Sequence, residues 1–329
     1  MKAIVQDKYG TAEVLRFEEI PQPHPGDNEV LIRVHAAGVD PSVTHIMTGL
    51  PHLVRLAFGF RRPRARVRGF DVAGTIEAVG AQVTQFRPGD EVFGFSNGAF
   101  AEYATARANK IAPKPSNLTF EQAAVVPVSA LTALQGLRDK GSIQAGQRVL
   151  VIGAGGGVGI YAVQIAKAFG AHVTALCSTS KIDLVRSLGA DEVIDYTRQD
   201  LGVGTDRYDI ILDSAGRRPL SLLQSLLTPR GTLVLVGGEG GSQWLAGLDR
   251  TLAALIRSKR GSQRLTGMLA SSKDADLLVM KELIEAGKVT PVIDRTFPLS
   301  EAPEAVRLAL AGHARGKTVI TIHSIEAPA

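Results

Sequence analysis

Five glycines stand between positions 153 and 159 of this 329-residue chain, in the sequence GAGGGVG. The run 149–152 before them is wholly apolar, which suits a strand buried on both faces of a parallel sheet, and apolar residues at helical spacing follow from Ile160 to Phe169. A diphosphate needs a backbone that it can approach closely and a helix N-terminus that directs free N–H groups at it. The order of strand, glycine turn and helix therefore predicts a dinucleotide site, and the alternative is a glycine-rich structural turn.

The pattern assigns positions within this site. The fingerprint G/A-x-G-x-x-G is met by Ala154, Gly156 and Gly159. We predict that the diphosphate lies against Gly155, Gly156, Gly157 and Val158. A later predicted strand, 232–236, ends at Gly237 and Gly238, and we expect these at the site too, because ligands bind outside the carboxyl ends of parallel strands.

The end of the second predicted strand, 173–177, indicates which nucleotide binds. An NAD enzyme usually carries Asp or Glu about 20 residues after the glycines, whereas this chain has Cys177, two serines, a threonine and Lys181. Hydroxyls and an ammonium can bind a 2′-phosphate that a carboxylate would repel. The residues favour NADPH, with Ser178 and Lys181 as the phosphate contacts. The alternative for the hydroxyl cluster is an N-cap of the next helix, a role that it can also combine with phosphate binding.

The predicted elements around these residues follow two sequence patterns. Residues 1 to about 120 show short runs rich in Val and Ile, such as 2–5, 30–35 and 71–79, separated by turn clusters, which is typical of an antiparallel barrel. From about Thr119, strands and helices alternate, which predicts a doubly wound parallel sheet. The extended and helical segments after residue 290 resemble the first pattern, so we expect them to belong to the barrel domain. The predicted α/β protein thus has a barrel domain, 1–121 and 290–329, and an inserted nucleotide domain, 122–289.

Composition limits the class of protein. With 45% hydrophobic residues the chain can bury a large core, and a formal charge of +5 does not by itself require nucleic acid or a membrane. Cys177 is the one cysteine, so no internal disulfide is possible, which favours a reducing compartment. The N-terminus resembles no secretory signal, and the longest apolar stretch is too short to span a bilayer. We therefore expect a cytoplasmic protein.

Several stretches, in order, resemble the medium-chain dehydrogenase/reductase superfamily, and within it the zinc-free quinone oxidoreductase branch. They are AAGVDPSVTHIMTG (36–49), GFDVAGTIEAVG (69–80), FRPGDEVFG (86–94), GAFAEYA (98–104), VVPVSALTAL (125–134), the glycine turn and LGADEVIDY (188–196). The segment from Cys177 to Tyr196 is also similar to the reticulon-interacting protein subgroup. The resemblance implies a GroES-like catalytic domain beside a Rossmann domain, NADPH-dependent reduction of quinones or conjugated carbonyls, and a homodimer.

The resemblance also implies cofactor contacts outside the glycine turn. Thr132 matches a residue beside the nicotinamide, and Tyr196 matches the family tyrosine near the adenosine phosphate. Lys317 is a further match, and its alternative is a solvated charge at the start of a strand.

No zinc site is predicted. Catalytic zinc needs about three nitrogen, sulfur or carboxylate ligands, and structural zinc about four. Gly69-Phe70-Asp71 stands where zinc-containing relatives carry Gly-His-Glu, and Val39-Asp40 stands where they carry a ligand cysteine. The seven histidines show no ligand spacing, and we expect most of them at the surface. Without a Lewis acid, alcohol oxidation is difficult, whereas quinones and conjugated alkenes spread negative charge themselves.

Two residues are candidates for catalysis, Asp40 and His45. Asp40 replaces the asparagine of the family's Gly-Val-Asn-Pro segment, and an ionised aspartate cannot donate the hydrogen bond that asparagine can. Asp40 would have to be protonated through burial or orient a water molecule. His45 falls where relatives often carry a tyrosine and could deliver a proton near neutral pH; the alternative is a structural or solvent-exposed histidine.

The segment 51–68 joins an apolar piece to five arginines. We interpret it as a surface helix and a charged loop; the alternative is a lid for hydrophobic acceptors that touches an acidic partner or a membrane surface. No nucleic-acid partner is expected, because aromatic stacking residues do not alternate with the arginines.

Three functions remain open. The first is an NADPH-dependent oxidoreductase that reduces quinones or other conjugated carbonyls by direct hydride transfer. The second is an alkenal or enoyl-thioester reductase. The third is a non-catalytic, crystallin-like protein that binds nucleotide or RNA, and Asp40 in place of asparagine is the residue that keeps this third function open.

Overall fold

The computed structural model describes the chain except residues 203–205, 237–246, 260, 313 and 323–329. The chain folds as two compact units. Unit 1 comprises Met1–Ser129, Ser272–Ala286 and the residues from Pro291 onward, and unit 2 comprises Ala130–Ser271 and Gly287–Thr290.

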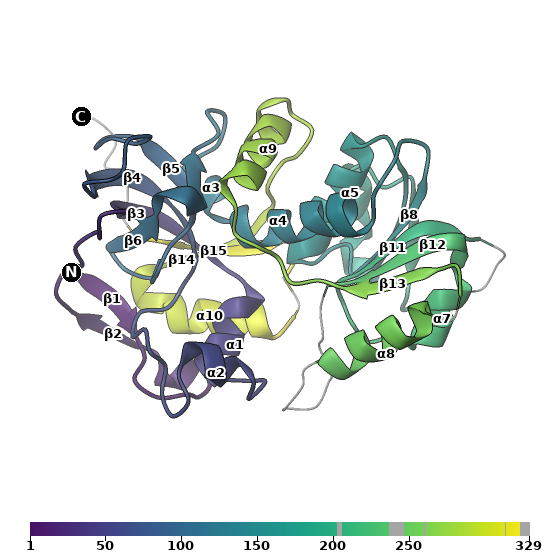
Figure 1. Ribbon diagram of the computed structural model, residues 1–329, viewed down its shortest axis with the longest axis horizontal. Coiled ribbons are helices and arrows are strands. Elements are labelled where there is room, and N and C mark those ends of the chain that lie inside the picture. The colour runs from purple at the N-terminus through teal and green to yellow at the C-terminus, as the bar shows by residue number, and fades with distance from the viewer. Residues whose placement is uncertain (203–205, 237–246, 260, 313, 323–329) are drawn as a thin grey trace. The chain divides into compact units, whose positions relative to one another are not determined.

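The described part of unit 1 contains a seven-stranded sheet and a two-stranded one (Figure 1). Its strands are β1 (Lys2–Val5), β2 (Arg16–Glu19), β3 (Glu29–Val39), β4 (Asp71–Val79), β5 (Glu91–Phe95), β6 (Tyr103–Arg107), β7 (Ile111–Pro113), β14 (Ile293–Pro298) and β15 (Lys317–Thr321). The large sheet runs β14-β15-β3-β4-β5-β7, with β6 also paired to β3, and β1 pairs with β2. All pairings are antiparallel except β14 with β15.

Helices lie around this sheet. They are α1 (Pro41–Thr48), α2 (Val54–Phe58), α3 (Phe120–Ala124), α9 (Asp274–Glu285) and α10 (Ala302–Leu310), with short 3-10 turns at Ala12–Val14, Ala108–Lys110 and Leu299–Glu301. Helix α10 begins at Ala302, directly after the 3-10 turn Leu299–Glu301. The core is built from alternate strand residues such as Ile32, Val34 and Ile76, all of which are buried.

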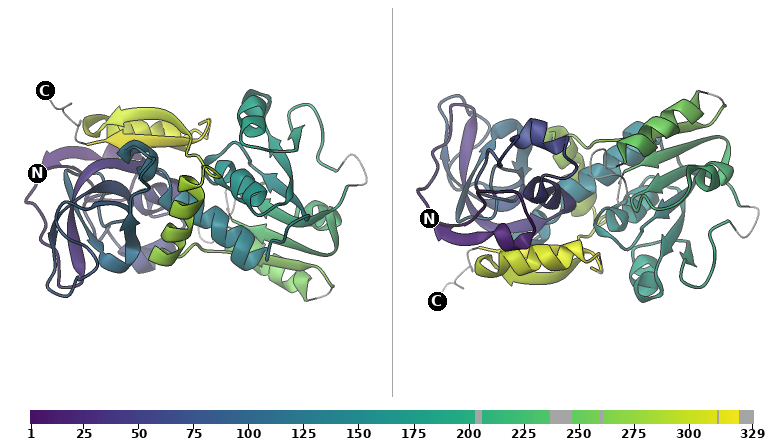
Figure 2. Two further views of the ribbon diagram at one scale, coloured as in Figure 1. Left: turned by 90° about the horizontal axis from the view of Figure 1, so that it is seen from above. Right: turned by 90° about the horizontal axis from the view of Figure 1, so that it is seen from below.

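The described part of unit 2 is a parallel six-stranded sheet in the order β10-β9-β8-β11-β12-β13. Its strands are β8 (Arg148–Ile152), β9 (His172–Cys177), β10 (Glu192–Asp195), β11 (Tyr208–Asp213), β12 (Leu227–Leu235) and β13 (Arg264–Gly267). Its helices are α5 (Gly157–Ala168), α6 (Ile182–Ser187), α7 (Leu220–Ser225) and α8 (Leu248–Ser258), with a 3-10 turn at Thr179–Lys181 and a π-helical turn at Gly136–Lys140. Helix α8 packs against the edge strand β13 (Figure 2). Taken in chain order, the strands follow the 3-2-1-4-5-6 order of a dinucleotide-binding fold, which confirms the predicted fold class.

The unit boundaries differ from the predicted ones at two places. Helix α4 (Pro127–Gln135) begins in unit 1, and α9 belongs to unit 1 although it was predicted in the nucleotide domain. Hydrogen bonds explain the placement of α9. The Glu285 carboxylate accepts from the Ser116 N–H and hydroxyl, and the Ile284 carbonyl accepts from Asn117. These bonds tie the end of α9 to the loop after β7.

Candidate active site and dinucleotide site

The glycine turn lies where the order of the parallel strands reverses. Strand β8 lies between β9 and β11, and the chain leaves it toward β9 and later returns to β11. Gly153 follows β8 directly with φ +81, a left-handed conformation that favours glycine. The Ser214 hydroxyl, just after β11, donates to the Ile152 carbonyl at 2.8 Å. The turn is therefore fixed at the topological switch point, where ligands bind in folds of this kind.

The start of α5 is built to receive an anion. Gly156 is its N-cap and makes no side-chain capping bond, and the Gly156 N–H donates to the Gly153 carbonyl at 3.0 Å. Residues Gly156, Gly157 and Val158 are half-buried, and the first N–H groups of a helix have no carbonyl within the helix to accept from them. A diphosphate would find free donors and a partial positive charge here, so the turn fits the predicted cofactor.

Two glycines of the turn have different reasons to lack a side chain. A Cβ at Gly159 would lie 2.2 Å from the Gly153 carbonyl oxygen and 2.6 Å from the Ala154 Cα, so helix and turn touch through backbone. A Cβ at Gly156 would meet only the Gly153 oxygen, at 3.3 Å. The fold requires glycine at 159, whereas glycine at 156 leaves open the space in front of the helix.

The residues predicted to bind the 2′-phosphate come together beside the turn. A Cβ at Gly155 would lie 2.6 Å from the Lys181 Cδ, so the Lys181 stem crosses this glycine. The hydroxyls of Ser178 and Ser180 are 3.4 Å apart, and neither Ser178 before the 3-10 turn nor Lys181 before α6 makes a side-chain capping bond. The capping alternative for these residues is therefore not realised.

One acid does lie close to this cluster. Asp195, at the end of β10, accepts hydrogen bonds from the hydroxyls of Thr179 and Thr197, and the hydrogen bond from Thr179 is the main cause that lowers the pKa of this carboxyl. Thr179 is thereby engaged, which leaves Ser178, Ser180 and Lys181 as the candidates for a phosphate.

The other predicted cofactor residues are spread over both units. The Tyr196 N–H donates to the Cys177 carbonyl at 3.1 Å, which places the half-exposed tyrosine beside Ser178. Thr132 is buried on α4. Gly237 and Gly238 lie outside the described residues.

Asp40 is held in a buried position at the start of α1. It is the helix N-cap, and its Oδ1 accepts from the Ser42 N–H at 2.8 Å and from the Ser42 hydroxyl. Its Oδ2 is buried and has no hydrogen-bond partner among the described residues. His45 lies on the exposed face of α1, where its Nδ1 is 3.0 Å from the Leu50 carbonyl oxygen. Of the two catalytic candidates, Asp40 is therefore buried and His45 is exposed.

Two further charged residues lie in this buried region. Asp71 is fully buried, and its Oδ1 accepts from the Val128 N–H at 3.0 Å. Burial, followed by the nearby Asp40 charge, raises the pKa of Asp71 well above its ordinary value, against the opposing effect of Lys317. Lys317 is buried and donates to the Ser129 hydroxyl at 2.9 Å. The alternative that Lys317 is a solvated charge is therefore wrong, because β15 is an interior strand between β14 and β3.

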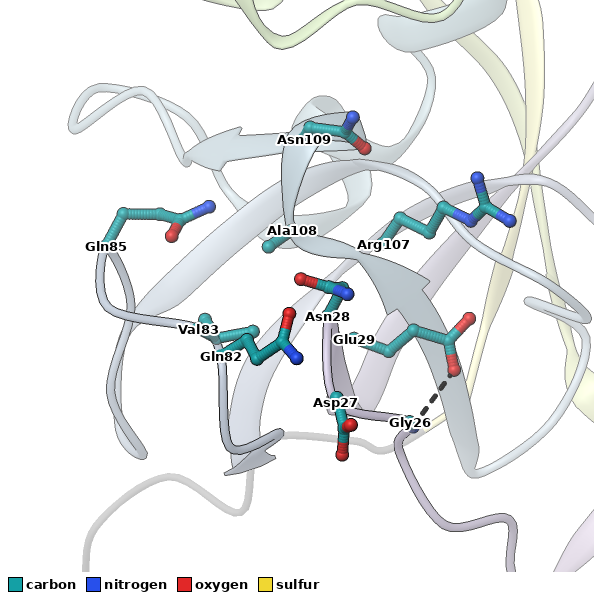
Figure 3. A pocket seen from close by; sticks show the side chains of 10 residues that line it. All are labelled: Gly26, Asp27, Asn28, Glu29, Gln82, Val83, Gln85, Arg107, Ala108 and Asn109. Carbon is teal, nitrogen blue, oxygen red and sulfur yellow. Dashed lines mark hydrogen bonds between the residues drawn. The ribbon is translucent and has the colours of Figure 1, made fainter.

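Unit 1 has a small apolar cavity of about 200 Å³ next to α1. Its apolar lining includes Val43 and Ile46 of α1, Phe58 of α2 and Phe70, and its polar lining includes Arg64, Arg68 and Asn97. A larger hollow of about 600 Å³ is lined by polar residues, including Asn28, Glu29 and Arg107 (Figure 3). Glu29 begins β3 and Asp40 follows its end, so this hollow is roughly 30 Å from the Asp40 region. The apolar cavity is the better candidate for the acceptor.

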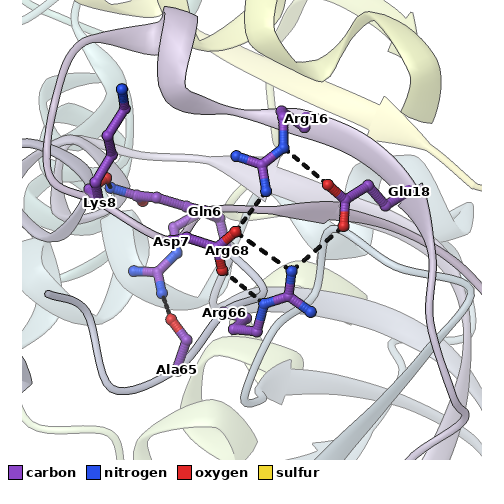
Figure 4. A network of polar contacts seen from close by, with 8 residues as sticks. All are labelled: Gln6, Asp7, Lys8, Arg16, Glu18, Ala65, Arg66 and Arg68. Carbon is purple, nitrogen blue, oxygen red and sulfur yellow. Dashed lines mark hydrogen bonds and ion pairs between the residues drawn. The ribbon is translucent and has the colours of Figure 1, made fainter.

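The arginines of segment 61–68 do not all behave as a charged loop. Arg66 pairs with Asp7 and Glu18 from the β1–β2 region, and Arg16 joins the same network (Figure 4). Hydrogen bonds from Arg66 and Arg16 hold the pKa of Asp7 at about 2. Arg68 is buried, donates to the Ala65 carbonyl, and has its pKa lowered to about 10 by burial. Leu56 of α2 is 66% exposed, which agrees with a surface helix for the apolar part.

Comparisons with known proteins place this geometry in a family. Residues 26–116 match the alcohol dehydrogenase GroES-like domain, and residues 188–320 match a domain described as zinc-binding dehydrogenase. The chain is 37% identical to the mitochondrial NAD(P)H oxidoreductase RTN4IP1 of Mus musculus, covering 98% of this chain and 89% of the relative. The chain belongs to the quinone oxidoreductase-like branch of the medium-chain dehydrogenase/reductase superfamily.

Two further comparisons agree with this branch. The chloroplastic quinone oxidoreductase QR1 of Triphysaria versicolor is 33% identical, over 97% of this chain and 98% of the relative. The crystal structure of Escherichia coli quinone oxidoreductase complexed with NADPH superposes with a TM-score of 0.84 at 26% identity, covering 98% of this chain and all of that one. The protein is thus an NAD(P)H-dependent, quinone oxidoreductase-like enzyme of this superfamily.

At the positions where zinc-containing relatives carry Gly-His-Glu, the side chains of this chain have a different chemistry. Phe70 has no ligand atom for a metal, and Asp71 points its carboxyl into the buried region with Asp40 and Lys317. In the parts of the chain that the structure describes, no three His, Cys, Asp or Glu side chains are grouped so that they could hold a metal ion. Likewise, none of the described helices is long and apolar enough to cross a membrane.

Sequence reasoning missed the residues that surround Asp40. In the sequence, Asp71 stands out only as the position of a lost zinc ligand, and no pattern points to Ser129. The signal that could have drawn attention to Asp71 is a carboxylate at the start of an otherwise apolar strand, DVAGTI.

Proposed function

We propose that the protein is an NADPH-dependent oxidoreductase that reduces quinones or other conjugated carbonyl acceptors by direct hydride transfer. The observation that carries this proposal is the position of Lys181 and Ser178 beside the open glycine turn. The turn supplies backbone donors for a diphosphate, and the cluster offers an ammonium and hydroxyls where an NAD enzyme offers a carboxylate.

The side chains of unit 1 suit an acceptor that stabilises its own negative charge. When bound, NADPH supplies a hydride, and the acceptor must then take up a proton. The cavity beside α1 presents Val43, Ile46 and Phe70 to a small apolar ring or alkene, and its volume lies below the range of drug-sized ligand sites. Phe70 and Val39 offer no ligand atoms for a Lewis acid, so charge in the reduced acceptor has to be spread over the acceptor's conjugated system.

Turnover of simple acceptors tests this function. We expect the purified protein to oxidise NADPH with a small quinone or an alkenal, followed by the loss of absorbance at 340 nm, at a rate that neither a chelator nor added zinc changes. Comparison of quinone with alkenal and enoyl thioester decides which acceptor class is used. NADPH consumption no faster than in protein-free controls with every acceptor would refute the proposal. Tight NADPH binding without turnover would instead support the non-catalytic alternative.

Cofactor choice is tested by Lys181→Ala. Loss of a charge-assisted contact to the 2′-phosphate should weaken NADPH binding about ten- to hundredfold and leave NADH binding nearly unchanged. Calorimetric titration of both nucleotides measures this difference. Lys288→Ala is the matched control, because Lys288 is an exposed lysine of the same unit. Equal losses for NADPH and NADH would remove the argument for a 2′-phosphate site.

Three sequence-based expectations remain predictions: a homodimer, a cytoplasmic location and the absence of a nucleic-acid partner.

A further inference from the structure

The register of the unit 1 sheet brings Asp40, Asp71 and Lys317 to one face at one end. Strand β15 pairs with β3 so that Thr318 is opposite Val39, and continuing this register places Lys317, the first residue of β15, level with Asp40, which directly follows β3. Strand β4 pairs with β3 so that Val72 is opposite Ala37, and continuing this register places Asp71, the first residue of β4, level with Gly38. Asp40 retains an extended backbone, with φ −133 and ψ 163. Residues 38 and 40 share a face because side chains alternate along a strand, and cross-strand pairs share it too.

The glycine at position 38 makes room for this grouping. A Cβ at Gly38 would lie 2.5 Å from the Ala124 carbonyl oxygen and 3.2 Å from the Asp71 Oδ2. The Asp71 carboxyl therefore lies directly over Gly38, in the space that a side chain would otherwise fill. From there Asp40 is the diagonal neighbour across the sheet, close enough for its charge to act on the Asp71 carboxyl.

The side chains of Asp40, Asp71 and Lys317 are buried, and the two carboxyls have only part of the hydrogen bonds that they could accept. Asp40 and Asp71 each use Oδ1 as an acceptor, and each has a buried Oδ2 without a hydrogen-bond partner among the described residues. Lys317 donates to the neutral hydroxyl of Ser129. The elements packed around the carboxyls add little charge: α3 presents the buried Ala123 and Ala124 and carries Glu121 in its first turn, and α4 contributes the Val128 N–H.

We propose that Asp40 and Asp71 hold one proton between them at neutral pH, and that this proton lets position 40 donate a hydrogen bond as the family asparagine does. Two ionised carboxylates beside one ammonium would leave a net buried negative charge, whereas one retained proton makes the group neutral. The electrostatics agree in direction, since burial and the Asp40 charge both favour the protonated form of Asp71. Asp71 is then a positioning residue that acts through Asp40.

The role in the reaction rests on the proposed function and on the place of Asp40 at the start of α1, the helix whose Val43 and Ile46 line the apolar cavity. After hydride addition, the reduced acceptor carries a negative charge on oxygen. The carboxyl O–H bond would break, its proton would form the new O–H bond of the product, and water would later return a proton to the doubly ionised pair. The hydride carries both electrons, so the pair transfers only a proton.

Infrared spectroscopy tests the shared proton independently of turnover. At pH 7 the protein should show the C=O stretch of a protonated carboxylic acid, which shifts in D2O. This band should be lost in Asp71→Asn and also in Asp40→Asn, because the remaining carboxylate then pairs with Lys317 in a neutral group. Lys317→Met should keep the band. Asp276→Asn, at another buried aspartate of unit 1, is the control and should leave it unchanged.

Two spectroscopic outcomes would overturn the proposal. Absence of the band in the wild-type protein would mean that both carboxyls are ionised. Persistence of the band in Asp40→Asn would mean that burial alone protonates Asp71. Circular dichroism of each variant shows that the fold is retained, and Lys317→Met provides a second reading should one aspartate variant fail to fold.

Turnover provides a separate test of the role. Asp71→Asn should lower kcat at least tenfold, because Asp40 then lacks a proton to donate. The double variant Asp40→Asn, Asp71→Asn should recover kcat to within a few-fold of wild type, because asparagine at 40 restores the donor. A double variant as slow as Asp71→Asn would contradict the positioning role. A wild-type protein that shows the band but reduces no acceptor would instead contradict the proposed function alone.

Discussion

Gly156→Ala should leave the fold intact and weaken NADPH and NADH binding together, by about tenfold or more, which corresponds to about 1.4 kcal/mol per factor of ten. Gly156 has φ −93, which alanine adopts without strain, and the nearest atom to the added methyl would be the Gly153 oxygen at 3.3 Å. The methyl would instead stand in front of the first turn of α5. There it would keep a diphosphate from the backbone donors.

Gly159→Ala should have a different signature, because it damages the fold itself. Its Cβ would lie 2.2 Å and 2.6 Å from backbone atoms of Gly153 and Ala154, so α5 must move away from the turn. Overpacking of this kind destabilises by about 1–3 kcal/mol or more, and the displaced helix also loses the cofactor. The two variants therefore distinguish a glycine needed by the ligand from one needed by the fold.

Thermal unfolding and nucleotide titration measure the two effects together. Gly261→Ala is the control, because a Cβ there has no neighbour within 4 Å, and it should change neither quantity. If Gly156→Ala bound NADPH as tightly as wild type, the diphosphate could not lie against this turn.

The sequence was most informative where the signal is local. The apolar run 71–79 predicted β4 with the bounds that the structure has, and the glycine turn with its helix was predicted to within three residues at its start. These elements are defined by alternation, glycines and apolar spacing within about 15 residues, and no distant contact is needed to recognise them. One local prediction was wrong: the apolar spacing predicts a helix over 220–227, whereas Leu227 belongs to β12, because it pairs with Tyr208.

The group around Asp40 could not be predicted in this way. Asp71 and Lys317 meet it through the pairing of β4 and β15 with β3, and nothing near either residue in the sequence records that pairing. A charged residue at the start of a strand is usually solvated, so Lys317 has the appearance of a surface lysine until β15 is known to be interior. Arg68 is a similar case, because it is buried although the other arginines of segment 61–68 are exposed.

Asp71→Asn should remove a pH dependence of stability that the wild-type protein shows as the pH rises from about 5, roughly one unit above the ordinary aspartate pKa. Burial raises the pKa of Asp71 in the folded state above the ordinary aspartate value of about 3.9 that applies to the unfolded chain. Between these two pKa values the folded state binds one more proton than the unfolded state. The free energy of unfolding of the wild-type protein therefore falls as the pH rises through this window, by up to about 1.4 kcal/mol per pH unit for one proton.

Because asparagine does not titrate, the variant should lack this slope and gain stability relative to wild type with each step in pH. Asp7 and Glu285, whose pKa values lie at about 2, stay ionised throughout the window and add no slope there. All other ionisable groups are common to the two proteins, so their contributions cancel in the difference. Urea unfolding at several pH values, followed by far-ultraviolet circular dichroism, measures that difference, with Asp276→Asn as the control. Parallel curves for wild type and Asp71→Asn would show that Asp71 is ionised in the folded protein, because only a proton held by the folded state makes the two curves diverge.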